Sequence, residues 1–242
     1  MSSPSRPADS VAPKGSRHGP LPWLLLILTV VTGLVDAVSY LKLGHVFVAN
    51  MTGNVVFLGF AAAGATDFSV AASLVAIVAF MGGALVAGRL ASPLGHHRGR
   101  FLAMAATVQI ALVAVALAVS MAAPDPGRGA ASYALIAPLA LAMGLQNATA
   151  RRLGVPDLTT TVLTLTLTGL AADSSLGGGS NPNVGRRLAA TAAMCLGAAV
   201  GAALLFHSGV SAVLVAAAAL LVLIGGASYR AWSSTEAWTV PA

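Results

Sequence analysis

The stretch that decides the fold is VDAVSYLKLGHVFVANMTGN, residues 35–54, and the second half of the chain contains a related pattern. The GLVDA block from Gly33 matches GLQNA from Gly144, an offset of 111 residues (144 − 33). Thr52 in the NMTGN block matches Thr164 in a threonine-rich run, an offset of 112 residues (164 − 52). Paired polar interruptions at matching positions of two apolar halves are typical of an internal repeat that builds a transport site.

The composition indicates an integral membrane protein. The chain is 57% hydrophobic and 8% charged, with a mean hydropathy of +0.86. A soluble domain carries about 25% charged residues because its surface must face water. The formal net charge of +6 comes from basic residues at segment ends, where they report orientation across the bilayer rather than a nucleic-acid partner. The single cysteine, Cys195, excludes an intramolecular disulfide.

Two of the apolar segments are poor membrane spans. We expect eight segments, at about 22–41, 46–65, 70–90, 101–123, 132–150, 158–172, 188–206 and 210–229. Crossing about 30 Å of hydrocarbon takes about 20 helical residues. The segment 158–172 has only about 15 residues by this criterion, and polar residues interrupt 46–65. Neither segment is expected to be a lipid-facing span.

The basic residues decide between two topologies. If all eight segments cross the membrane, the 13 basic residues divide almost evenly between its two sides. If 46–65 and 158–172 instead return to the side they left, only Lys42 and Arg128 lie outside and the other eleven lie inside (13 − 2 = 11). Short loops follow the positive-inside rule, which favours the second arrangement. We therefore predict an all-α membrane protein with six full spans and two broken or re-entrant elements; eight crossing helices are the alternative.

This topology predicts an inverted 3+3 repeat. Residues 1–20 are expected to be a disordered cytoplasmic tail, 21–230 a single transmembrane domain with halves at about 21–123 and 132–230, and 231–242 a C-terminal tail. A signal peptide is the alternative for the first apolar segment, but its length favours a first span. Three spans per half is an odd number, so the halves insert with opposite orientation and their polar motifs converge near the bilayer centre.

The motifs also carry a family resemblance. The VDAVSYLKLGHVFVANMTGN block and the AMGLQNATARRLG block, followed by TTTVLT, resemble the YoaK family of uncharacterised bacterial inner-membrane proteins. The resemblance extends over about residues 24 to 228. It implies a multi-pass protein of the bacterial inner (plasma) membrane and no established activity. With the charge pattern, it leads us to expect a cytoplasmic N-terminus.

Asp36 is the acidic residue that lies well inside a predicted span. A carboxylate in hydrocarbon costs about 3 kcal/mol on insertion scales unless it is paired or hydrated. The functional interpretation is a group that couples transport to a proton or cation. The alternative is an interfacial aspartate near the end of its span, with Lys42 as an imperfectly spaced partner.

The other candidate binding residues are amides, hydroxyls and one glycine. They are expected either to line a permeation path or to join helices by hydrogen bonds, and threonines in membrane helices also bond to their own carbonyls. Asn147 occupies the position equivalent to Asp36. The predicted substrate- or ion-binding residues are Asp36, Asn50, Thr52, Gly53, Asn54, Gln146, Asn147, Thr160, Thr161 and Thr164.

Enzymatic chemistry has little support in the sequence. There is no nucleophile elbow, Walker loop or His-Glu-x-x-His motif, and the histidines show no metal-ligand grouping. We expect no enzyme activity, no cofactor, no metal site and no nucleic-acid partner. The leading prediction is a small transporter or channel for a small solute or ion. The alternative is a non-transporting membrane scaffold. The expected partners are the lipid bilayer, a small solute or ion, and further copies of the chain in a homo-oligomer.

Overall fold

The protein is all-α. A computed structural model describes residues 18–160, 163–180 and 183–240, and within these ranges it contains eight α-helices, two short 3-10 helices and no strand. Most of the tail predicted at residues 1–20 lies outside the described residues. The 3-10 helices are η1 (Ser175–Gly177) and η2 (Ala237–Thr239).

Six helices are long and apolar enough to cross a membrane. They are α1 (Leu21–Lys42), α3 (Val70–Leu94), α4 (Arg98–Ala122), α5 (Gly129–Leu153), α7 (Val184–Ser208) and α8 (Val210–Arg230). They have 21 to 25 residues each, which at the helical rise makes them about 32–38 Å long. The other two helices, α2 (Met51–Ala62) and α6 (Leu163–Ala172), have 12 and 10 residues. The predicted fold class of six spans and two short elements is confirmed.

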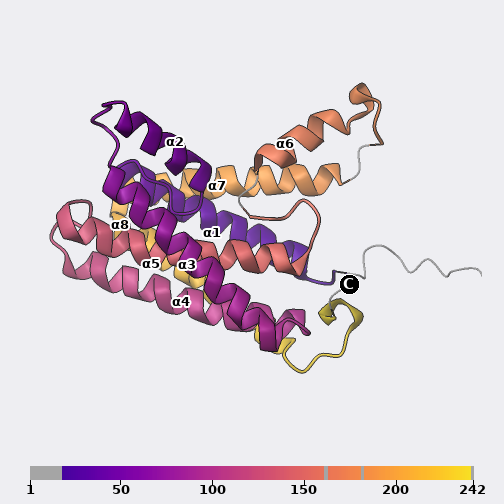
Figure 1. Cartoon of the computed structure of the whole chain (residues 1–242). Coiled ribbons are helices and arrows are strands. Elements are labelled where there is room, and N and C mark those ends of the chain that lie inside the picture. The colour runs from indigo at the N-terminus through magenta and orange to yellow at the C-terminus, as the bar shows by residue number, and fades with distance from the viewer. Residues whose placement is uncertain (1–17, 161–162, 181–182, 241–242) are drawn as a thin grey trace, which may run out of the picture.

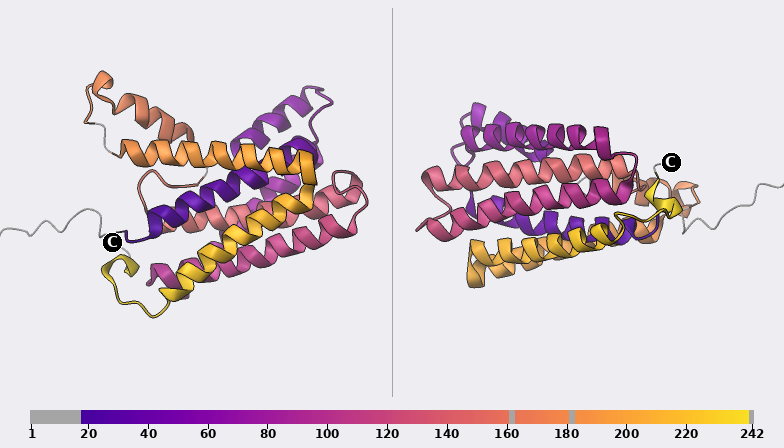
Figure 2. Two further views of the ribbon diagram at one scale, coloured as in Figure 1. Left: turned by 180° about the vertical axis from the view of Figure 1, so that it is seen from behind. Right: turned by 90° about the horizontal axis from the view of Figure 1, so that it is seen from below.

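The two short helices lie together on one face of the long-helix bundle (Figure 1). Their first residues are near each other in the middle of this face, and the helices diverge from there toward opposite ends of the bundle (Figures 1 and 2). Helix α2 returns to the end at which α1 finished, and α6 returns to the end at which α5 finished. Both are therefore re-entrant elements, as the charge distribution predicts.

The basic residues gather at one end of the bundle. This end holds the first turns of α1, α4 and α7, the last turns of α3, α5 and α8, and both ends of the described chain (Figure 1). The described basic residues that belong to it are Arg89, Arg98, Arg100, Arg151, Arg152, Arg186, Arg187 and Arg230. Lys42 and Arg128 lie at the other end, where both approach Asp125 at 3.4 Å. The segregation matches the arrangement with two re-entrant elements.

The helix contacts follow a pseudo-twofold relation in which α1, α2, α3 and α4 exchange with α5, α6, α7 and α8. The pair α1–α7 corresponds to α5–α3, α1–α8 to α5–α4, α2–α3 to α6–α7, and α3–α4 to α7–α8. The remaining pairs of α-helices, α4–α8 and α1–α5, map onto themselves. The two halves are therefore an inverted repeat, and α1 and α5 each pack against the third helix of the opposite half.

Equivalent glycines allow these interlocking helices to touch. On α1 and α7, a Cβ atom at Gly33 would clash with the Met194 carbonyl, and one at Gly197 would clash with the Val30 carbonyl. On α5 and α3, Gly144 and Gly83 have the same relation to opposing backbone. Such close backbone approach is how small residues join helices in a membrane. Four glycines thus hold the two polar-motif helices, α1 and α5, in fixed places.

Candidate functional site

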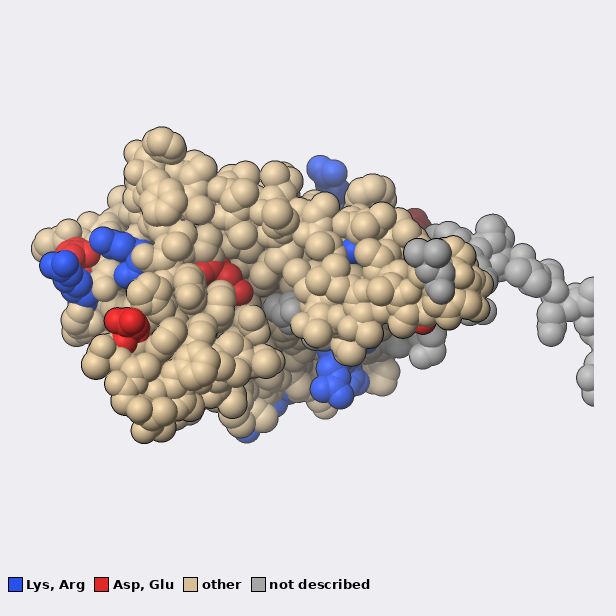
Figure 3. All heavy atoms as spheres, turned by 90° about the horizontal axis from the view of Figure 1, so that it is seen from above, with Lys and Arg blue, Asp and Glu red and all other residues tan. Residues whose placement is uncertain are grey.

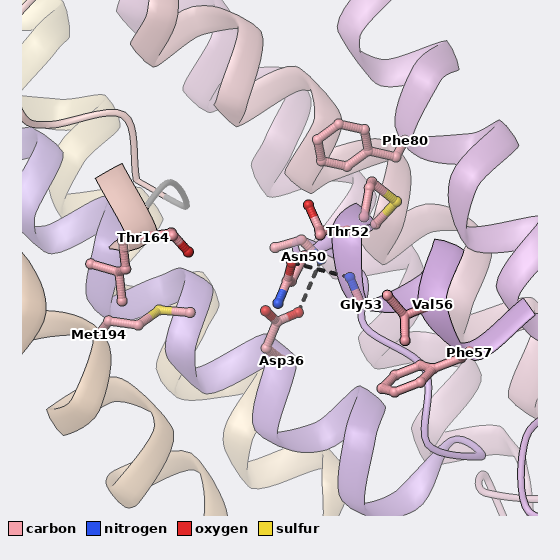
Figure 4. A pocket seen from close by; sticks show the side chains of 12 residues that line it. Asp36, Asn50, Thr52, Gly53, Val56, Phe57, Phe80, Thr164 and Met194 are labelled. Carbon is pink, nitrogen blue, oxygen red and sulfur yellow. Dashed lines mark hydrogen bonds between the residues drawn. The ribbon is translucent and has the colours of Figure 1, made fainter. Parts of the chain in front are cut away.

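Asp36 fixes the loop that leads from α1 into the re-entrant helix α2. Its side chain is 5% exposed, and its Oδ1 accepts hydrogen bonds from the backbone N–H groups of Val48 (3.1 Å) and Ala49 (3.0 Å). The other oxygen, Oδ2, has no hydrogen-bond partner in the described part of the chain. Figure 4 shows the carboxylate beside an open space. Oδ1 therefore holds the loop before α2 in place, and Oδ2 is free to accept a hydrogen bond from a ligand.

The NMTGN block starts α2 in the middle of one face of the long-helix bundle (Figure 1). Asn54 is fully buried and pairs with the backbone of Phe47, accepting from its N–H (2.9 Å) and donating to its carbonyl (2.6 Å). Asn50 caps α2 by accepting from the Gly53 N–H at 3.4 Å. A Cβ atom at Gly53 would come within 2.8 Å of the Phe47 ring. Asn54 and Gly53 therefore shape the turn, whereas the Thr52 side chain borders a cavity (Figure 4).

A cavity of about 710 Å³ lies between the two short helices. In Figure 4, Asp36 and Thr52 border it on one side, and Thr164 and Met194 border it on the other. Figure 3 views the same face of the molecule and shows acidic atoms in the middle of a surface that is otherwise mostly uncharged. The lining residues are Asp36, Ala49, Asn50, Met51, Thr52, Gly53, Val56, Phe57, Phe80, Leu163, Thr164 and Met194.

The cavity straddles the pseudo-twofold axis, because equivalent residues line it in pairs. These pairs are Met51 with Leu163, Thr52 with Thr164, and Phe80 with Met194. The first two pairs have the offset of 112 residues found in the sequence. The third has an offset of 114 (194 − 80), which also relates the first residues of α3 and α7 (184 − 70). The polar motifs of the two halves therefore meet at one shared space.

Two of the predicted binding residues belong to helix packing instead. Gln146 is 1% exposed; it donates to the Leu28 carbonyl (3.1 Å) and to the Thr32 hydroxyl (2.8 Å), and it accepts from Gln109 (2.6 Å). Asn147 donates to the Met143 carbonyl one turn earlier in α5, at 3.0 Å. Neither residue lines the cavity. Gln109 escaped the sequence interpretation, although it is a lone amide in an apolar segment.

The threonines of the second motif divide between two places. Thr164 lines the cavity, whereas Thr160 borders a separate hollow of about 10 Å³ beside Thr29 and Asp157. Thr160 has a φ of 62°, which is strained for a β-branched residue. Its buried hydroxyl has no partner within the described ranges. Thr161 lies outside the described residues.

The two re-entrant helices are anchored by different contacts. Arg187 of α7 binds Asp157 before α6 (Nε to Oδ1, 3.0 Å) and Asp173 after it (Nη1 to Oδ2, 2.7 Å). Helix α2 is anchored by an aromatic cluster instead: Tyr40, His45, Phe47, Phe57, Phe60 and Phe68. Phe57 and Phe68 stack with ring centroids 4.7 Å apart.

The arrangement can bind a polar solute but offers no catalytic grouping in the part of the chain that the structure describes. Those residues contain no group of three or more His, Cys, Asp or Glu side chains that could hold a metal ion. Asp36 is the one charged side chain among the twelve that line the cavity. Thr52, Thr164 and Asn50 supply neutral hydrogen-bonding groups. The cavity wall therefore combines one carboxylate with neutral hydrogen-bonding groups.

Comparison with known proteins gives a family and one curated relative. The model of the family described as "Protein of unknown function (DUF1275)" matches residues 24–226. The UPF0700 transmembrane protein YoaK of Bacillus subtilis (strain 168) is 36% identical over 152 residues. The match covers 63% of this chain and 66% of the relative, slightly less than two thirds of its length. No solved structure matches the chain.

Proposed function

The chain belongs to the DUF1275 family of proteins of unknown function, and from its own site we propose that it is a transporter of a small solute or ion. It is a multi-pass membrane protein, and the resemblance to the YoaK family that its motifs indicated is confirmed. The family description names no substrate. The proposal therefore rests on the geometry of the cavity.

The observation that carries the proposal is the cavity on the pseudo-twofold axis between two re-entrant helices. Broken helices at membrane depth expose backbone groups, which is tolerated only where protein or water satisfies them. Inverted-repeat transporters place their binding sites at such breaks. A scaffold would be expected to have a dry, fully paired interface here. A space of about 710 Å³ with the Asp36 carboxylate in its wall supports transport instead.

The fold also offers a means of alternating access. Helix α2 packs on α3 and α6 packs on α7, so each short helix belongs with a different long helix. The helices diverge toward opposite ends of the bundle (Figure 1). We propose that α2 closes the cavity toward one side of the membrane and α6 closes it toward the other. Asp36 binds the proton, cation or positively charged group that moves.

The proposed location is the inner (plasma) membrane of a bacterium, with the N-terminus in the cytoplasm. It is supported by the basic end of the bundle, because short basic loops stay on the cytoplasmic side. Reporter fusions placed after Arg100 and after Arg152 test this orientation. Both fusions should be cytoplasmic, and an extracytoplasmic reporter at either position contradicts it. No enzymatic role, cofactor or nucleic-acid partner forms part of the proposal.

Purified protein in liposomes tests the function directly. We expect saturable flux of at least one compound from a panel of ions and small metabolites, with flux depending on the proton, cation or positively charged substrate group that Asp36 binds. Asp36→Asn should remove that dependence while the protein stays folded. Asp125→Asn is the matched control, since it removes a carboxylate outside the cavity. Absence of flux across the whole panel, with folded protein in the liposomes, would favour the scaffold.

A further inference from the structure

We propose that the cavity binds a small zwitterion, specifically an α-amino acid with an apolar side chain. This inference rests on the proposed function, because it names the substrate class of the same site. The ammonium group of the ligand meets Asp36 Oδ2, its carboxylate meets the first N–H groups of α2, and its apolar side chain occupies the rest of the cavity.

The ammonium position follows from the free oxygen of Asp36. Oδ1 is already occupied by the N–H groups of Val48 and Ala49. Oδ2 has no partner in the described ranges, and the side chain is 5% exposed and lines the cavity. A nearly buried carboxylate oxygen is costly unless it meets a cation or a hydrogen-bond donor. A primary ammonium supplies both.

The carboxylate position follows from the start of α2. This 12-residue helix begins at Met51, and no partner is found in the described chain for the N–H groups of Met51 and Thr52. Gly53 donates only a long bond to Asn50, at 3.4 Å. Unpaired N–H groups and the helix dipole together attract an anion. All three residues line the cavity, Figure 4 shows Thr52 and Gly53 on the Asp36 side, and the Thr52 hydroxyl adds another donor.

The charges in the wall select a ligand that is neutral overall but carries separated charges. Asp36 contributes one negative charge, and the start of α2 contributes about half a positive charge. The first three residues of α2 line the cavity together with Asp36, so the wall offers both signs of charge. A simple cation is opposed by the start of α2, and a simple anion is opposed by Asp36. A zwitterion satisfies both groups at once.

The remaining wall accepts an apolar side chain. It contains Val56, Phe57, Phe80, Leu163 and Met194, and no second charged group. A cavity of about 710 Å³ is within the range of small-molecule sites. An amino acid with a charged side chain would have to bury that charge without a partner. Aliphatic and aromatic amino acids therefore fit best.

Equilibrium binding of three matched compounds tests the inference with the purified full-length protein in detergent. The compounds are leucine, isopentylamine, which lacks the carboxylate, and 4-methylpentanoate, which lacks the ammonium. We expect leucine to bind saturably and each analogue to bind at least about tenfold more weakly, because each leaves a polar group of the site unpaired. Equal binding of all three compounds, or no saturable binding of leucine, overturns the inference.

Two variants assign the two ends of the ligand. In Asp36→Asn the amide oxygen still accepts from Val48 and Ala49, but the charge is gone. Leucine should then bind no more tightly than 4-methylpentanoate but still more tightly than isopentylamine. Met51→Pro removes one N–H at the first helical position, where proline is tolerated. This variant should reduce the difference in affinity between leucine and isopentylamine.

Matched controls keep the two variants interpretable. Val70→Pro places proline at the first residue of α3, outside the cavity, and Asp125→Asn removes an exposed carboxylate; neither should change the three affinities. Unchanged selectivity in folded Asp36→Asn overturns the ammonium assignment. Leucine binding without flux into liposomes overturns the transport function but leaves the site. Flux of another solute without leucine binding overturns the inference and leaves transport standing.

Discussion

Helices α2 and α6 occupy equivalent places in the two halves, yet they are anchored by different chemistry. Aromatic rings surround α2, and its loops carry no ion pair in the described residues. Around α6, Arg187 joins the aspartates on either side of the helix. The difference shows that the repeat preserves the path of the backbone and not the contacts that hold it.

Because of this difference, salt should affect the contacts that anchor α6 more than those that anchor α2. Stacked aromatic pairs contribute about 0.5–1.5 kcal/mol each beyond burial and depend little on salt. Ion pairs near an aqueous boundary weaken as salt screens them. Asp157 is 18% exposed and Asp173 is 45% exposed, so water and ions reach this anchor. We expect α6 to be the re-entrant helix that responds to ionic conditions.

Asp36 and Asn147 form a second unequal pair. They are equivalent in the repeat, but Asp36 reaches across to hold the loop before α2, whereas Asn147 donates within its own helix. The shared cavity is lined by Asp36 and not by Asn147. The backbone is thus symmetric, but only one half supplies a charged group to the cavity. The two sides of the site therefore differ in charge.

The largest effect is expected for Asp36→Ala. It leaves the buried N–H groups of Val48 and Ala49 without an acceptor, at about 1–3 kcal/mol each, so the free energy of unfolding should fall by about 2–6 kcal/mol. Asp36→Asn retains the acceptor and should lose less than about 1 kcal/mol. Reversible unfolding in mixed micelles measures both values. Equal losses for the two variants would mean that the charge, and not the acceptor, supports the loop.

The second effect tests the anchor of α6. Arg187→Met leaves Asp157 and Asp173 without their common partner, so amide hydrogen exchange in α6 should accelerate by at least about tenfold. Exchange in α2 should not change. Raising the salt concentration should reproduce part of this effect in the unaltered protein. Acceleration in both short helices would show that they are not held independently.

The sequence predicted the meeting of the two motifs because polar groups in an apolar chain are conspicuous. Asp36, Thr52 and Thr164 stand out against their surroundings, and the offset of 112 residues places the threonines at equivalent points. The same reasoning could not separate Thr52 from Asn54, since both are polar and two residues apart. Their roles differ because Asn54 turns back to pair with the Phe47 backbone. Which polar group faces a cavity depends on this turn.

The apolar wall of the cavity was beyond prediction for the opposite reason. Phe80 and Met194 lie in apolar stretches of their helices and resemble many other residues that face lipid or core. Only the repeat offset of 114 residues marks them as a pair, and that offset becomes meaningful once α3 and α7 are aligned. Arg187 was similarly hidden, because a basic residue at a helix end reports orientation as readily as an ion pair.

A smaller effect tests the anchor of α2. A double-mutant cycle on Phe57 and Phe68, each replaced by Leu, should give a coupling energy of about 0.5–1.5 kcal/mol for their stacked rings. Because no charge is involved, the coupling should be the same at low and high salt. Unfolding in micelles at the two salt concentrations measures it. If the coupling energy disappeared in high salt, the claim that only the α6 anchor depends on salt would be wrong.

The smallest effect concerns Asp125, which forms exposed ion pairs far from α6. Its replacement tests whether α6 is loosened by the loss of any charge or only by the loss of Arg187. The hydrogen bond from the Gly127 N–H and the nearby Lys42 ammonium lower the pKa of Asp125 below its usual value. Its contribution to stability is therefore present above the pKa of the unfolded chain and is lost as the pH falls through the lower folded value. Asp125 and Lys42 are both more than 40% exposed, so water screens most of this contribution. Asp125→Asn should make the melting temperature slightly less sensitive to acid without changing hydrogen exchange in α6. If this variant loosened α6 as Arg187→Met does, any lost charge would suffice, and the anchor between α6 and α7 would have no special role.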